Sequence, residues 1–132
     1  MPILLVTALY AALLALIFVI LSFRVIAVRR RLGVAVGDGG DDGLTRRVRA
    51  HANFAEYVPI ALILMLASEL AGATDWMLHA LGATLIIGRI VHAWSLSAHS
   101  IAGRTIGMSL TFLVLVAGAV LAAAAAFDAF AV

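Results

Sequence analysis

Residues 49–59 have the sequence Arg-Ala-His-Ala-Asn-Phe-Ala-Glu-Tyr-Val-Pro, a polar stretch at the start of a long apolar segment. A charge near the centre of a membrane-spanning helix costs about 2.5–3.5 kcal/mol, so such residues usually face a binding site or a bundle interior. At the helical spacing of about 100° per residue, five polar side chains share one face, whereas His51 points away from it. These five are Arg46, Arg49, Asn53, Glu56 and Tyr57. This polar face predicts a site for an anionic, polar ligand.

The composition is that of an integral membrane protein. The chain has 132 residues, of which 65% are hydrophobic, and its mean hydropathy is +1.17. Soluble domains contain only about 45–50% apolar residues. The chain has no cysteine. Disulfides, thiolate metal sites and a cysteine nucleophile are therefore excluded, and any thiol chemistry must come from a substrate. The histidines lack the spacing of metal ligands.

The apolar segments predict a single domain over residues 1–132, an all-α bundle of four membrane-spanning helices. The helices are expected at about residues 2–28, 45–70, 75–96 and 105–127. Residues 2–23 carry no charge and arginines follow them, which is the reverse of the order in a cleavable signal peptide. We therefore expect the first segment to be retained as a helix.

The charge distribution predicts the orientation in the membrane. All basic residues are arginines, and each lies in the loop after the first or third helix or in the adjoining helix halves. Glu69 and Asp75 lie toward the other end. By the positive-inside rule, we expect the arginine-rich loops in the cytoplasm and both termini outside.

Two further segments are interpreted as structural. Residues 33–43 are rich in glycine and aspartate, which is typical of a flexible, solvated linker. They lack the pattern of a phosphate-binding loop and the spacing of a calcium loop. Gly103 and Gly107 are four residues apart at the start of the fourth helix, and such spacing indicates close packing between helices.

Helix 3 offers a second polar face. Arg89 and His92 are three residues apart and share it. Glu56 and Arg89 each lie roughly 10 Å from the same membrane boundary. Equal depth and opposite charge predict an ion pair between helices 2 and 3. Two interpretations stay open, namely a purely structural link and part of a binding site.

Other arginines lie at helix ends. Arg104 precedes the fourth apolar run, where its charge adds to the partial positive charge of a helix N-terminus. A thiol with an ordinary pKa near 8.5 would ionise more readily there. The alternative is an interfacial anchor. The group Arg29–Arg31 is also interpreted first as anchors, and Arg30 is assigned to a bound carboxylate although the sequence does not choose among the three.

Residues 49–59 resemble the R-A-x-x-N-x-x-E-x-x-P signature of the MAPEG family, the membrane-associated proteins of eicosanoid and glutathione metabolism. Residues 88–92, Gly-Arg-Ile-Val-His, look like the start of the third-helix motif of its prostaglandin E synthase branch. The four-span layout agrees, so the resemblance covers nearly the whole chain. The short loops are most similar to those of the small bacterial members.

The resemblance implies a homotrimer of four-helix subunits that binds glutathione, as co-substrate, between neighbouring subunits near the cytoplasmic face. In that picture Arg104 matches the thiolate-stabilising arginine of the family, and Thr105 adds a hydroxyl donor. The residues implied to hold the tripeptide come from helices 2 and 3, and they are Arg49, Asn53, Glu56, Tyr57, Arg89 and His92.

One residue departs from the family pattern. Several members carry a tyrosine four residues after the position of His92, and this chain has Leu96 there. The change puts part of the glutathione contact in doubt. The family also includes a member that binds lipid without catalysis, so membership alone does not imply an enzyme.

Our leading hypothesis is a glutathione-dependent transferase or peroxidase of the inner membrane. Its second substrate would be an apolar electrophile or a lipid hydroperoxide that arrives from the bilayer. The alternative is a non-catalytic lipid- or partner-binding scaffold with the same fold. A small four-helix exporter is disfavoured, because such exporters use an acidic residue in helix 1 and this helix has none.

Overall fold

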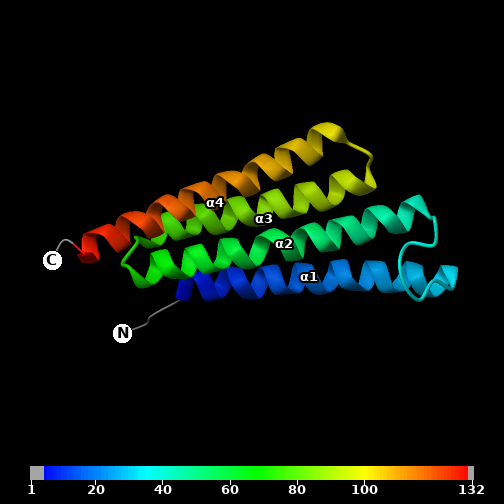
Figure 1. The fold of residues 1–132 in the computed structure, drawn as a ribbon, viewed down its shortest axis with the longest axis horizontal. Coiled ribbons are helices and arrows are strands. Elements are labelled where there is room, and N and C mark those ends of the chain that lie inside the picture. Colours follow the sequence, from blue (N-terminus) through cyan, green and yellow to red (C-terminus); the bar gives the residue numbers. More distant parts are fainter. Residues whose placement is uncertain (1–4, 131–132) are drawn as a thin grey trace.

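Four long helices make up the part of the chain that the computed structural model describes, residues 5–130. They are α1 (Leu5–Leu32), α2 (Asp42–Leu70), α3 (Asp75–Ser97) and α4 (Ile101–Phe130) (Figure 1). Each is long and apolar enough to cross a membrane. The all-α architecture with four spans is therefore confirmed. Residues 2–4 of the first predicted span lie outside the described residues.

The end of α1 and the starts of α2 and α4 differ from their predicted positions because capping interactions extend these helices beyond the apolar runs, and α4 also continues to Phe130 rather than to about residue 127. α1 continues to Leu32, since arginines are favourable in the last turn of a helix and Gly33, with a φ of 68°, ends it. α2 begins at Asp42 because the Asp41 side chain accepts a hydrogen bond from the Leu44 N–H at 2.6 Å. α4 begins at Ile101 rather than near residue 105.

The loop between α1 and α2 is shorter than the predicted linker, because residues 42 and 43 belong to α2. Asp38 organises it by accepting hydrogen bonds from the Gly40 N–H and the Thr45 hydroxyl. The hydrogen bond from Gly40, followed by that from Thr45, lowers the pKa of the Asp38 carboxyl. The loop is thus held against the start of α2.

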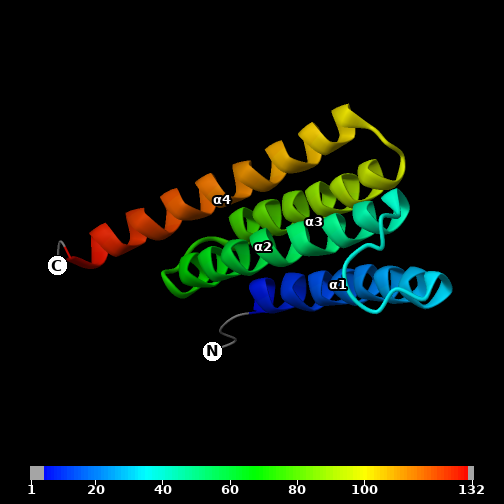
Figure 2. The ribbon, with the colours of Figure 1, turned by 45° about the vertical axis from the view of Figure 1, so that its right-hand side comes forward.

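The helices run alternately up and down, with α2 and α3 at the centre of the bundle (Figure 1). α1 packs against α2 and α3, and α4 packs against α3 and α2. Both loops that join arginine-rich helix ends lie at one end of the bundle, and the start of α1 and the end of α4 lie toward the other (Figures 1 and 2). The nine arginines are therefore gathered in the half of the bundle that carries these two loops.

Large apolar side chains cover the outer faces of the bundle. Leu16, Phe23 and Val116 are each at least 63% exposed in the single chain. An apolar surface of this kind is stable against lipid rather than water. The interior contains buried residues such as Leu14, Met65 and Leu85.

The close approach of α3 and α4 depends on glycines. A Cβ atom on Gly107 would lie 2.7 Å from the backbone nitrogen of His92 and 2.8 Å from the carbonyl oxygen of Gly88. Because backbone atoms cannot move aside cheaply, only glycine allows the two helices this separation. The predicted packing role of Gly103 and Gly107 is confirmed, since a Cβ atom on Gly103 would likewise lie only 2.7 Å from the Cβ of Ser95.

The end of the bundle away from the arginines is joined by polar contacts. The Glu69 carboxylate accepts hydrogen bonds from the backbone N–H groups of Val6 at 3.0 Å and Thr7 at 2.9 Å, and so caps the start of α1. The Tyr10 hydroxyl lies 3.1 Å from Nδ1 of His79. These contacts hold α1 to α2 and α3 far from the arginine-rich end.

Candidate functional site

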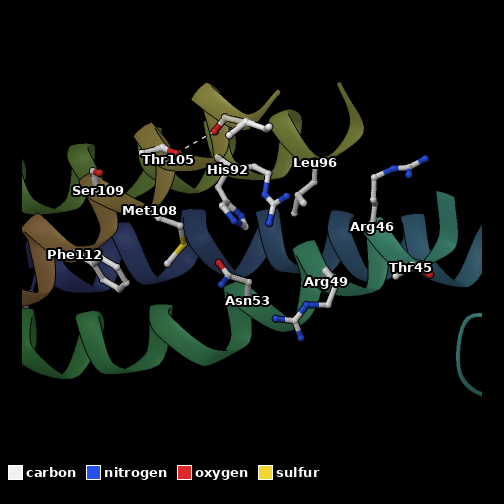
Figure 3. Close-up of a pocket in the computed structure, with 12 residues that line it drawn as sticks. Thr45, Arg46, Arg49, Asn53, His92, Leu96, Thr105, Met108, Ser109 and Phe112 are labelled. Atoms are coloured by element: carbon white, nitrogen blue, oxygen red, sulfur yellow. Dashed lines mark hydrogen bonds between the residues drawn. The ribbon is translucent and has the colours of Figure 1, made fainter. Parts of the chain in front are cut away.

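A pocket of about 760 Å³ lies at the arginine-rich end between α2, α3 and α4. Its size falls within the range of about 300–1,000 Å³ that is common for small-molecule sites. Figure 3 shows Asn53 from α2, His92 from α3 and Met108 from α4 converging, while Arg46 extends away from them. The lining residues are Thr45, Arg46, Arg49, Asn53, His92, Leu96, Ile101, Arg104, Thr105, Met108, Ser109 and Phe112.

The pocket is strongly basic. Arg46, Arg49 and Arg104 line it, and none of its lining residues within the described part of the chain is acidic. Arg49 and Arg104 are exposed, so their guanidinium groups are free to meet a ligand. Three fixed positive charges around one pocket favour a ligand with carboxylate or other anionic groups.

Arg104 lies in the first turn of α4. The helix begins three residues earlier, and the Ser100 hydroxyl accepts a hydrogen bond from the Gly103 N–H at 3.1 Å. The prediction that Arg104 stands next to a helix N-terminus therefore holds, although the terminus is one turn further out than expected. The charge and the helix dipole act on the same side of the pocket.

Arg89 lies behind the pocket wall rather than in it. Its side chain is only 1% exposed and contacts the ring of Phe54, whose centroid is 5.8 Å from the guanidinium carbon. It donates hydrogen bonds to Oδ1 of Asn53 at 2.6 Å and to Nδ1 of His92 at 3.1 Å. A third reaches the Thr111 hydroxyl at 3.2 Å.

The predicted ion pair between Glu56 and Arg89 is wrong for the single chain. Glu56 is exposed on the outer surface of α2, whereas Arg89 is buried among neutral acceptors. Helical spacing predicted that the two residues lie at the same depth. It did not predict that Asn53, one turn away on α2, takes the position beside Arg89.

Two other predicted residues also lie outside the pocket wall. Tyr57 is half-buried and packs edge-to-face against Phe112, with ring centroids 5.6 Å apart. It therefore supports a pocket residue. Arg30 is exposed beside a separate hollow of about 450 Å³ that includes Arg29 and Val34. Within one chain, the predicted residues that the pocket brings together are Arg46, Arg49, Asn53, His92, Arg104 and Thr105.

Several pocket residues were missed because they carry no charge. Met108 and Phe112 follow Arg104 at intervals of four residues, and Ser109 follows Thr105 in the same way. This spacing places them on the same face of α4 as Arg104. Helical spacing counted onward from Arg104 would have found them.

Leu96 lines the pocket and is 7% exposed. The pocket wall therefore has an aliphatic side chain at the position where several MAPEG members carry a tyrosine hydroxyl. His51 faces the other way, as predicted. It stacks on Phe18 of α1 and lies 3.0 Å from the Ser22 hydroxyl.

Comparison with known proteins settles the family. The model of the MAPEG family matches residues 7–124, which include α2 and α3, most of α1 and α4, and the whole pocket. The chain belongs to the MAPEG family. "Inner membrane protein YecN" of Escherichia coli K12 is 43% identical over 110 residues, which cover 83% of this chain and 84% of that protein. The protein of the same name from Escherichia coli O6:H1 matches equally well.

Proposed function

We propose that this MAPEG protein is a glutathione-dependent transferase or peroxidase that acts on apolar electrophiles or lipid hydroperoxides. The observation that carries the proposal is the basic pocket, which combines Arg49, Asn53, His92 and Arg104 between three helices of a family that includes such enzymes. Glutathione carries two carboxylates and a thiol, so its charge complements that of the pocket.

The pocket residues divide into binding and activating groups. Arg49 is suited to one carboxylate, because a guanidinium can donate two parallel hydrogen bonds to it. Arg104 is suited to the thiolate, because its charge and the α4 N-terminus favour the ionised sulfur. Lowering the thiol pKa by two units requires about 2.7 kcal/mol. A charge about 4 Å away contributes roughly 1–4 kcal/mol between water and a partly desolvated site, so Arg104 and the helix dipole together reach this value.

In this mechanism the thiol proton leaves to solvent and the thiolate attacks the second substrate. With an electrophile, a sulfur–carbon bond forms and the leaving group departs. With a hydroperoxide, the thiolate attacks the terminal oxygen, so a sulfur–oxygen bond forms while the oxygen–oxygen bond breaks, and the alkoxide takes up a proton and leaves as an alcohol. A second glutathione then attacks the sulfur of the resulting sulfenic acid, which gives glutathione disulfide and releases the oxygen as water. The apolar substrate enters from the bilayer, since Met108 and Phe112 give the pocket an apolar side.

The functional assembly is proposed to be a homotrimer in the inner membrane, with the arginine-rich loops in the cytoplasm. Glu56 and Arg30 are exposed and lie outside the pocket of their own chain, where a neighbouring subunit can use them. In a trimer these residues would complete the glutathione site from the partner. The inner-membrane location is supported by the name of the Escherichia coli relative.

Calorimetric titration of the detergent-purified protein with glutathione tests the proposal. The wild type should bind one glutathione per subunit, and Arg49→Ala should weaken binding by at least about tenfold, since a charge-assisted bond contributes about 1.5–3 kcal/mol. Arg47→Ala is the matched control, because Arg47 is the same residue type on the same helix and donates to the Gly43 carbonyl instead. Lack of binding by the wild type, or an equal loss in both variants, would refute the proposal.

The second candidate is a non-catalytic lipid- or partner-binding scaffold, and Leu96 in the pocket wall favours it. Ultraviolet absorbance of the thiolate separates the two functions. An enzyme should produce the thiolate band when glutathione is added at neutral pH, and Arg104→Ala should reduce it. A scaffold should produce no band even where glutathione binds.

A further inference from the structure

Arg89 is the most deeply buried charged residue around the pocket, and the groups that satisfy it are all neutral. The Asn53 amide, the His92 ring, the Thr111 hydroxyl and, at 4.0 Å, the sulfur of Met108 accept its hydrogen bonds. Asn53, His92 and Met108 line the pocket, whereas Arg89 itself does not. The buried cation therefore touches three of the groups that a ligand would meet.

The direction of these hydrogen bonds determines what the pocket residues offer a ligand. A guanidinium carries five N–H donors and no acceptor, so every partner of Arg89 must accept. Oδ1 of Asn53 is consequently turned toward Arg89, and the amide NH₂ group remains for the pocket. Nδ1 of His92 must carry a lone pair, so the ring proton is on Nε2. Both pocket residues then present N–H donors.

We propose that Arg89 is a positioning residue that sets the hydrogen-bond polarity of the pocket without contacting the ligand. It orients the Asn53 amide and selects the Nε2–H tautomer of His92. Together with Arg46, Arg49 and Arg104, these groups make a pocket wall of donors that selects ligands by their carboxylate or thiolate acceptors. The identification of that ligand as glutathione rests on the proposed function. The donor character that Arg89 gives to the pocket wall does not depend on it.

The burial of Arg89 gives this arrangement a second consequence. A cation removed from water is costly when its partners are neutral dipoles, and Nε of Arg89 has no hydrogen-bond partner within residues 5–130. An anionic ligand in the pocket is separated from Arg89 by only one side chain, such as that of Asn53 or His92, and therefore reduces the free-energy cost of burying this cation. The site therefore favours an anion through charge as well as through direct donors.

The first experiment measures the His92 tautomer in the ligand-free protein by ¹⁵N–¹H correlation spectra of histidine-labelled samples, with His92→Gln used to assign the signals. The wild type should show an unprotonated Nδ1 and a protonated Nε2. Arg89→Met removes the donors at similar length and should give a mixture of tautomers. Thr111→Val is the matched control, because it changes an Arg89 contact that does not line the pocket.

The outcome is decisive even if Arg89→Met does not fold. Arg89→Gln is a second uncharged variant, and its amide can turn either its NH₂ group or its oxygen toward Nδ1 of His92, so it too should show mixed tautomers. A protonated Nδ1 in the wild type would overturn the proposal, and so would an unchanged tautomer in every folded Arg89 variant. None of these measurements uses glutathione, so they test the role of Arg89 independently of the proposed function.

The second experiment uses Asn53→Asp, which keeps an oxygen acceptor for Arg89 and replaces the pocket donor by a negative oxygen. The fold should be retained, since the buried cation gains a counter-ion, while glutathione affinity should fall by roughly tenfold or more. Wild-type affinity in Asn53→Asp would overturn the assigned polarity. If the wild type does not bind glutathione, the proposed function fails, and the tautomer measurement alone decides the role of Arg89.

Discussion

The packing of α4 against α3 predicts that Gly107→Ala will damage both stability and the pocket. The added Cβ would lie 2.7 Å from the backbone nitrogen and from the Cβ of His92 and 2.8 Å from the Gly88 carbonyl oxygen. Ordinary contact begins at 3.4 Å, so the helices must separate locally by about 0.7 Å. Because His92 and Arg104 lie on the two helices that separate, the pocket geometry changes with the packing.

The expected loss of stability in Gly107→Ala follows from the atoms that the added Cβ would meet. Overpacking against fixed atoms costs typically about 1–3 kcal/mol, and the helix preference of alanine over glycine offsets at most about 1 kcal/mol of this. We expect a net loss of about 1–2 kcal/mol in the free energy of unfolding. A shift of this size at a binding site should also weaken glutathione binding measurably, since donor geometry degrades over a few tenths of an ångström.

Denaturant unfolding in mild detergent, followed by circular dichroism, measures the stability, and calorimetry measures the binding. Gly118→Ala is the control, because it makes the same substitution on the same helix but meets only Leu64, whose Cβ would be 3.1 Å away. It should cost less stability and leave binding unchanged. Wild-type stability and affinity in Gly107→Ala would refute the reasoning that glycine is required at this crossing.

Two further substitutions separate chemistry from stability. Arg104→Ala should slow turnover roughly 5- to 30-fold, because an exposed charge near the thiolate contributes about 1–2 kcal/mol. Glutathione affinity, measured by calorimetry, should change little. An equal loss of turnover and affinity would contradict the thiolate role. Glu69→Gln should lower the unfolding free energy by about 1 kcal/mol, because the carboxylate caps α1 through Val6 and Thr7. Glutathione affinity should stay at the wild-type level in that variant, and a change there would show that the two ends of the bundle are coupled.

The polarity of the pocket connects the local chemistry to the fold. α2 contributes Asn53, α3 contributes His92, and the glycine-dependent approach of α4 brings Arg104 to the same space. The buried Arg89 links the first two by hydrogen bonds. A substitution that shifts α2, α3 or α4 against a neighbouring helix is therefore expected to alter the pocket geometry. Substitutions at the end of the bundle away from the arginines are not.

Much of the fold was readable from the sequence because membrane insertion imposes simple constraints. Apolar runs of sufficient length must be helices, since no water is present to satisfy an unpaired backbone. The alternation of four spans predicted that the loops after the first and third helices lie on the same side, and the structure places them at one end of the bundle. Of the five residues on the predicted polar face of α2, Arg46, Arg49 and Asn53 line one pocket, whereas Glu56 and Tyr57 lie outside it.

Only the tertiary structure decided which side chain each polar group meets. Helical periodicity gives the face and depth of a residue, but the rotation and tilt of the neighbouring helix choose its partner. Arg89 consequently pairs with Asn53 and His92, whereas Glu56, the partner predicted from equal depth, remains exposed. The uncharged residues of α4, such as Met108 and Ser109, gave no signal of their own, because a neutral side chain in a membrane helix has little energetic preference until a packed neighbour surrounds it.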